Sequence, residues 1–228
     1  MAAASAAEVT LRNAEGIDLL AFHARPRKPT GVGIVVLPDV RGLHQFYKEL
    51  AVRFAETGAE AVAIDYFART AEDPDRAEGF DFAPHVQQTT PEGIAADVHA
   101  AVDHLREAGV RSVFTVGFCF GGSYSWRQSA DTPGLAGAIG FYGRPERTED
   151  AVDGMRAPLL MLVAGADANI RVGDVEQLAR RARAAGVAAD LHVFDDAPHS
   201  FFDRRAAEHA QACARAWDLV RAFIHDHA

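Results

Sequence analysis

Two kinds of apolar pattern alternate along the chain. Short continuous apolar runs are typical of strands buried on both faces, and they lie at residues 32–37, 61–64, 113–116, 137–141, 159–163 and 191–194. Between them, apolar residues recur every three to four positions and predict amphipathic helices within 45–57, 94–105, 172–182 and 213–224. Strands that alternate with helices predict an α/β fold, with a mostly parallel, doubly wound central sheet and helices on both faces.

The ends and the irregular segments complete this organisation. Residues 9–11 and 19–23 flank a turn and predict an opening β-hairpin. The 228 residues suit one α/β domain over 1–228, in which the alanine-rich residues 1–7 are expected to be disordered. Residues 69–93 lack a regular pattern and contain several prolines, among them Pro74. Such a segment is often a lid or a binding loop, and a plain surface loop is the alternative.

Charge and composition narrow the class of protein. A net charge of −9 opposes binding to nucleic acid or to an anionic membrane. No stretch approaches the roughly 18 apolar residues of a membrane span, and the start of the chain lacks the features of a signal peptide. Two cysteines, Cys119 and Cys213, give no disulfide framework and fit a reducing compartment. We therefore expect a cytoplasmic protein, monomeric or a small homo-oligomer, that acts on a small molecule.

The most informative segment is Gly117-Phe118-Cys119-Phe120-Gly121-Gly122. It lies between a predicted strand and a predicted helix, which is the pattern of a nucleophile elbow with cysteine at its apex. Glycines on either side allow the tight reversal. The first amides of the following helix favour an anion such as a thiolate, and the backbone N–H of Phe120 would donate to an oxyanion. Cys119 is a candidate nucleophile, and a small buried core cysteine is the alternative.

A nucleophilic cysteine needs a base, and the base needs an orienting acid. In folds with this elbow the chain order is nucleophile, acid and histidine. Asp167 and His199 each follow a predicted strand, so Cys119, Asp167 and His199 have the order of a catalytic triad. Asp195 and Asp196 are rival acids, but they lie too close to His199 in the chain to come from a separate strand end.

The loop after the strand at 32–37 is expected to supply the second oxyanion donor, the backbone N–H of Val40. Asp39 precedes it, and we expect its carboxylate to face the thiol of Cys119. A helix-cap or turn role is the alternative for Asp39. The sequence has no His-Glu-x-x-His motif and no glycine-rich nucleotide loop, so no metal and no cofactor are expected.

With these residues the chain resembles the dienelactone hydrolase family of the α/β-hydrolase fold. The resemblance is carried, in the expected order, by segments 37–42, 61–67, 117–122, 140–143, 165–167 and 199–202. It implies a Cys-Asp-His triad that opens a cyclic enol ester through an acyl-enzyme, which water then hydrolyses. The family's carboxylate beside the thiol is usually glutamate, where this chain has Asp39. Arginines grip the substrate carboxylate in family members, and Arg69, Arg144 and Arg204 are candidates for that role here.

The sequence therefore predicts a hydrolase of carboxylic esters or lactones, a carboxylesterase or lactonase, in which His199 takes the thiol proton and later activates water. An aromatic group predicts an apolar pocket, with core packing as the alternative. The candidate substrate-binding residues are Tyr66, Arg69, His85, Phe118, Tyr142, Arg144, Phe201 and Arg204. Two other functions stay open: a non-catalytic protein that binds a small molecule, and a thiol hydrolase acting on peptides or thioesters.

Overall fold

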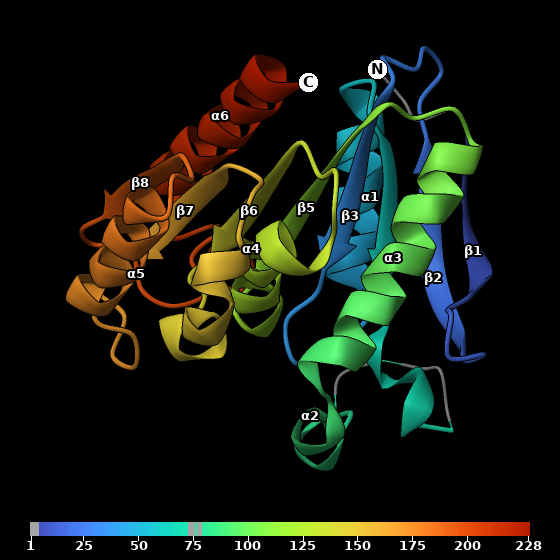
Figure 1. Ribbon diagram of the computed structural model, residues 1–228, viewed down its shortest axis with the longest axis horizontal. Helices are drawn as coiled ribbons and strands as arrows, with labels where there is room; N and C mark the ends of the chain where they lie inside the picture. Colours follow the sequence, from blue (N-terminus) through green and yellow to red (C-terminus); the bar gives the residue numbers. More distant parts are fainter. Residues whose placement is uncertain (1–4, 73–75, 77–78) are drawn as a thin grey trace. The chain divides into compact units, whose positions relative to one another are not determined.

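The computed structural model describes residues 5–72, 76 and 79–228, so Pro74 lies outside the described residues (Figure 1). Its contacts divide the chain into two compact units, Met1–Phe114 and Thr115–Ala228. The organisation of 1–228 as one domain stays a prediction. Within the described part of the chain, no helix has both the length and the apolar character that a membrane span requires.

The first unit is built on four strands in the order β1-β2-β4-β3. The antiparallel pair β1 (Ser5–Arg12) and β2 (Asp18–Arg25) confirms the predicted hairpin. The side chain of Asn13 holds its turn by accepting hydrogen bonds from the amides of Glu15 and Ile17, each at 3.0 Å. β2 pairs antiparallel with β4 (Glu60–Ile64), which runs parallel to β3 (Val32–Leu37). All of β3 is buried, as its continuous apolar run predicts.

The first strand begins earlier than the hydrophobic pattern indicates. Ser5 to Ala7, which the sequence led us to expect as disordered, pair with residues 23–25 of β2. These three residues are exposed, so backbone hydrogen bonds and not side-chain burial hold them in the strand. A pattern of buried and exposed side chains therefore could not reveal this end of the strand.

Two long helices cover opposite faces of the first unit's strands (Figure 1), α1 (Gln45–Glu56) and α3 (Pro91–Glu107). Each begins at a side-chain cap: His44 accepts from the amide of Phe46 at 3.2 Å, and Thr90 accepts from the amide of Gly93 at 3.1 Å. The predicted apolar stripe of α1 is buried against the strands. Gly58, with φ of 101°, follows its end and turns the chain into β4.

The segment 69–93 is more regular than its sequence indicates. It contains the end of the 3-10 helix η1 (Tyr66–Arg69), the short helix α2 (Ala83–Gln88) and the start of α3. No residue of α2 is buried, and the neighbouring Phe82 is exposed. A buried ion pair at 2.7 Å, between Asp65 and Arg76, ties the segment to the end of β4. The role of the segment as a lid or binding loop stays a prediction.

The second unit carries strands in the order β5-β6-β7-β8. β5 (Ser112–Phe118) begins at the end of the first unit, and β6 (Gly137–Phe141), β7 (Leu159–Ala164) and β8 (Ala189–Phe194) pair in parallel. The helices are α4 (Phe120–Asp131), α5 (Val172–Ala184) and α6 (Ala210–His227), with 3-10 turns η2 (Pro145–Arg147) and η3 (Glu149–Gly154).

Both faces of the second unit's strands are covered. One face packs Leu159, Met161 and Val163 of β7 against Trp126 of α4 and Leu178 of α5, and these two helices lie on the same side of the strands (Figure 1). Neighbouring strand residues point to opposite faces, and their neighbours on β7 are equally buried. α6 contacts β6 and β7 and buries its own apolar residues. Helices on both faces of parallel strands confirm the predicted doubly wound α/β class.

Candidate active site

Cys119 occupies the sharp turn that the sequence predicts between β5 and α4. Its backbone has φ of 54° and ψ of −109°, a left-handed region that residues with a side chain rarely adopt. Such a conformation costs on the order of 1–3 kcal/mol and persists only where surrounding contacts hold it. The Cys119 amide donates to the carbonyl of Phe141 at 3.0 Å, and the residue is only partly buried. A cysteine held in this way can present its sulfur to a ligand.

Glycines around Cys119 allow chain segments to approach more closely than side chains permit. A Cβ atom on Gly117 would lie 1.9 Å from the carbonyl oxygen of Gly121. A Cβ on Gly122 would lie 2.4 Å from the carbonyl oxygen of Phe141, the same oxygen that accepts from Cys119. Contacts this short exclude any side chain at either position, which explains the glycines of the motif.

Phe120 is the first residue of α4, so its N–H belongs to the first-turn amides that have no partner within the helix. These amides and the helix dipole place positive charge beside the residue that precedes them, which is Cys119. The ring of Phe120 is buried and packs on Tyr124, with ring centroids 4.8 Å apart. The guanidinium of Arg147 lies 5.0 Å over the same ring. No sequence motif marks Arg147, because its contact depends on how η2 folds back on α4.

Asp167 and His199, which follow β7 and β8, meet as the sequence predicts. Nδ1 of His199 lies 2.5 Å from Oδ2 of Asp167, whose side chain is almost completely buried. Oδ1 of Asp167 accepts from the Asn169 amide at 2.9 Å. Burial raises the pKa of Asp167, but the hydrogen bonds from His199 and from the Asn169 amide outweigh it and lower the pKa below its usual range. Asp167 is therefore a carboxylate that orients the ring.

His199 also bonds to the thiol of Cys119, so the three predicted residues come together within the second unit. Burial of the ring lowers its pKa, but the hydrogen bonds with Asp167 and with Cys119, and the charges of both partners, raise the pKa to about 9. The ring is thus protonated at neutral pH while its partners are anionic. The loops that carry Asp167 and His199 are joined by a hydrogen bond from the Ala166 amide to the Ala197 carbonyl at 3.0 Å.

The predicted aromatic residues of this unit divide into two kinds. Tyr142 has a positive φ of 40°, and its ring centroid lies 5.0 Å from that of His199. Phe118 and Phe201 are almost fully buried and stack or tilt against Phe141. Their burial favours the core-packing alternative, whereas Tyr142 lies directly beside the imidazole.

The predicted arginines lie in different surroundings. Arg144 and Arg204 of the second unit are exposed. Arg69 of the first unit pairs with Asp97 and with Glu15, each at 2.6 Å, and donates to the carbonyl of Gly93 at 3.1 Å. These bonds join the opening hairpin, η1 and α3, so Arg69 has a structural role within its unit. Its binding of a substrate carboxylate stays a prediction.

Asp39 takes part in the turn that follows β3. Its carboxylate accepts from the Arg41 amide at 2.9 Å and from the Arg41 guanidinium at 2.9–3.0 Å, and its carbonyl accepts from the Gly42 amide at 3.1 Å. This is the turn role that the sequence left open as the alternative. The orientation of Asp39 toward the thiol, and the Val40 amide as oxyanion donor, stay predictions.

Tyr66 and His85 also make bonds inside the first unit. The Tyr66 hydroxyl donates to the carbonyl of Pro38 at 2.9 Å and so anchors the start of the loop that contains Val40. Nδ1 of His85 lies 2.9 Å from the Thr70 hydroxyl, and its ring stacks on Phe80 with centroids 5.1 Å apart. Tyr66, together with Arg69, lines a cavity of about 250 Å³.

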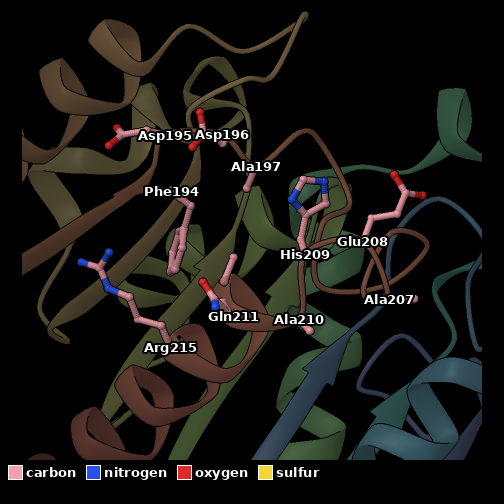
Figure 2. A pocket seen from close by; sticks show the side chains of 11 residues that line it. Phe194, Asp195, Asp196, Ala197, Ala207, Glu208, His209, Ala210, Gln211 and Arg215 are labelled. Carbon is pink, nitrogen blue, oxygen red and sulfur yellow. The ribbon is translucent and has the colours of Figure 1, made fainter.

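A larger cavity of about 520 Å³ lies between the end of β8 and the start of α6 (Figure 2). It is lined by Asp195 and Asp196, the rival acids of the sequence analysis, and by Glu208, His209 and Arg215, among others. Both aspartates are exposed, and the carboxylate bound to the His199 ring is that of Asp167. Among the described residues no cluster of His, Cys, Asp and Glu has the arrangement of a metal site.

Comparison with known proteins matches residues 19–228 to the dienelactone hydrolase family. A protein of Escherichia coli (strain K12) named "Putative carboxymethylenebutenolidase" is 29% identical over 221 residues, covering 90% of this chain and 82% of that protein. A Bradyrhizobium protein named "Probable 2-oxo-3-(5-oxofuran-2-ylidene)propanoate lactonase" is 28% identical over 230 residues, covering 93% of this chain and 91% of that protein.

Among solved structures, a crystal structure titled "Putative Dienelactone Hydrolase" from Klebsiella pneumoniae has a TM-score of 0.86 and 26% identity, covering 97% of this chain and 98% of that one. The similarity confirms the α/β-hydrolase fold that the strand and helix pattern predicted. The family match extends over nearly the whole chain and includes the elbow and the loops after β7 and β8. The chain therefore belongs to the dienelactone hydrolase family and is a hydrolase of the ester and lactone type.

Proposed function

We propose that the protein hydrolyses carboxylic esters or lactones through an acyl-enzyme formed on Cys119. One observation carries the proposal: the imidazole of His199 is hydrogen-bonded both to the buried carboxylate of Asp167 and to the thiol of Cys119. A strained cysteine at the start of a helix, bonded to an oriented imidazolium, is the arrangement that a thiolate nucleophile needs. A binding protein without turnover has no need of it.

In the first half of the reaction, the His199 ring holds the proton that the thiol has lost. The Cys119 thiolate attacks the acyl carbon, and the N–H groups of Phe120 and Val40 donate to the oxyanion that forms. One such donor typically contributes about 3 kcal/mol to the stability of the transition state. The carbon–oxygen bond of the ester then breaks, and His199 gives its proton to the leaving oxygen. A lactone opens in this step and stays attached as an acyl-enzyme.

In the second half, neutral His199 takes a proton from water, and the resulting hydroxide attacks the thioester carbon. The carbon–sulfur bond breaks, the carboxylic acid leaves, and the thiolate returns to its pair with the protonated ring. Asp167 keeps the ring in one orientation through both steps. No cofactor takes part in the proposed cycle, and a cytoplasmic enzyme fits a nucleophile that must stay reduced.

The substrate class follows from the relatives and from the residues near His199. The names of the E. coli and Bradyrhizobium relatives are those of lactone-cleaving enzymes, so we propose a lactone or an activated ester as substrate. Tyr142 is the aromatic side chain nearest to the base, and we propose that it contacts the acyl group. Arg144 and Arg204 are the proposed groups for a substrate carboxylate.

The proposal is tested with Cys119→Ala and, as a matched control, Cys213→Ala. Both variants remove one thiol, but Cys213 lies on α6 and donates to the carbonyl of Phe201 at 3.2 Å. Turnover of an aryl ester and of a panel of lactones, each with and without a carboxylate, is measured together with thioesters and short peptides. We expect Cys119→Ala to lose turnover and Cys213→Ala to keep it. Retained turnover in Cys119→Ala would refute the mechanism, and preference for thioesters or peptides would refute the substrate class.

A further inference from the structure

Ser123, one turn into α4, is a fully buried residue whose hydroxyl bonds to the nucleophile elbow. Its Oγ donates to the carbonyl of Cys119 at 3.3 Å, and its amide donates to the same carbonyl at 3.2 Å. Two donors on one carbonyl fix the orientation of the peptide group that follows Cys119. That peptide group contains the N–H of Phe120, so the hydroxyl bears directly on the direction of this amide.

The same hydroxyl reaches a second strained segment. Oγ of Ser123 accepts from the Arg144 amide at 2.7 Å, so its one hydrogen and one of its lone pairs are both used. Arg144 lies two residues after Tyr142, whose φ is 40° and whose ring is beside His199. Between them, a Cβ atom on Gly143 would lie 2.6 Å from the Ser123 amide nitrogen. The hydroxyl therefore bridges the elbow and the loop that carries Tyr142.

A third contact fixes Ser123 itself. The hydroxyl of Thr148, which is fully buried, donates to the carbonyl of Ser123 at 3.0 Å. Thr148 closes η2, the turn whose Arg147 covers the ring of Phe120. The contacts of Ser123 thus join Cys119, Tyr142 and η2 in one network that has no contact with solvent at its centre.

We propose that Ser123 is a positioning residue for the reaction. Its hydroxyl holds the Cys119–Phe120 peptide and the Tyr142 loop in fixed orientation relative to the His199 imidazole, and it does not touch substrate. The inference rests on the proposed function of Cys119 as nucleophile. It differs from ordinary core packing in its consequence, because loss of this hydroxyl disturbs the reacting groups and not only the free energy of unfolding.

The test compares Ser123→Ala with Ser125→Ala in the full chain. Ser125 is an equally buried serine on the same helix, and its hydroxyl donates to the Ile139 carbonyl at 2.7 Å and to Thr115 at 2.9 Å. Each variant removes one buried hydroxyl, so both lower the melting temperature. We expect kcat for an aryl ester to fall about tenfold in Ser123→Ala, which corresponds to one lost hydrogen bond in the transition state. We expect KM to stay unchanged, and both parameters of Ser125→Ala to stay within about twofold.

A second readout is the pH dependence of Cys119 alkylation by iodoacetamide, followed by peptide mass. A shifted profile in Ser123→Ala, with the wild-type profile in Ser125→Ala, supports positioning. Equal kcat in the two variants, or unchanged kcat in Ser123→Ala, overturns it. If Ser123→Ala does not fold, Thr148→Val removes the bond to the Ser123 carbonyl with little change in shape, and a loss of kcat below that of Ser125→Ala is required. Cys119→Ala measured in parallel separates the two ideas, because its retained activity refutes the proposed function itself.

Discussion

Replacing Asp167 by asparagine is expected to lower the pKa of His199. In the wild type, the pKa is raised from 6.5 to about 9, which corresponds to a preference for the protonated ring of about 3 kcal/mol. The side chain is 29% exposed, so solvent screening makes this figure an upper bound. Asp167 and Cys119 both contribute to the rise, against burial, which acts in the opposite direction.

The three groups predict an ordered series of pKa values. Asp167→Asn removes one anionic partner, so the pKa of His199 falls to between 6.5 and 9, and Cys119→Ala has the same effect through the other partner. In the double variant only burial remains, and the pKa falls below 6.5. The measurement is an NMR titration of the histidine ring protons, in which His199→Gln identifies the resonance among the ten histidines. A pKa that stays at about 9 in Asp167→Asn, or above 6.5 in the double variant, would refute the reasoning.

The same shift links stability to pH. The pKa of His199 is higher in the folded chain than in the unfolded chain, so its contribution to stability is complete below pH 6.5 and is lost as the pH rises through about 9. Urea unfolding between these two pH values should therefore show a smaller loss of stability for Asp167→Asn than for the wild type. An equal loss in both proteins would assign the pH dependence to other groups.

Three further predictions concern other parts of the chain. Cys119→Gly should be more stable than Cys119→Ala by about 1 kcal/mol, because glycine adopts the positive φ of 54° without strain; equal melting temperatures would contradict the strain. Gly122→Ala should destabilise the fold by about 1–3 kcal/mol and lower activity, since its Cβ would meet the Phe141 carbonyl; wild-type stability and turnover would contradict this. His23 is buried between Glu60 at 2.7 Å and His104 at 2.9 Å, and burial lowers its pKa, so stability should fall as the pH decreases below 6.5 toward the folded-state pKa. Urea unfolding of His23→Gln should show a flatter acid limb, and an unchanged limb would exclude His23 as its source.

The residues that could be predicted from the sequence are those fixed by local pattern and chain order. Continuous apolar runs predicted β3, β6 and β7, because strands buried on both faces have no polar alternation. Asp167 and His199 could be found because each directly follows a strand, and parallel strands end at the same edge of a sheet. The glycines of the elbow marked a turn that side chains cannot enter.

Other features depend on contacts between distant segments, which no local pattern records. Arg69 was a candidate for binding substrate, but its partners Asp97 and Glu15 come from elements far along the chain in both directions. Ser123 was not recognised because a serine in a helix carries no signal until the Arg144 amide lies against it. The start of β1 escaped recognition because exposed residues there are held by backbone bonds alone.

The most direct test of the account is the capture of the acyl-enzyme. Wild-type protein is mixed with an excess of an aryl ester, quenched in acid within the first turnovers, and analysed by peptide mass, with Cys119→Ala treated in the same way. The account predicts one acyl group on the peptide that contains Cys119 in the wild type, and none on any peptide of the variant. Release of product by the wild type through an acyl group on another residue, with Cys119 unmodified, would contradict it.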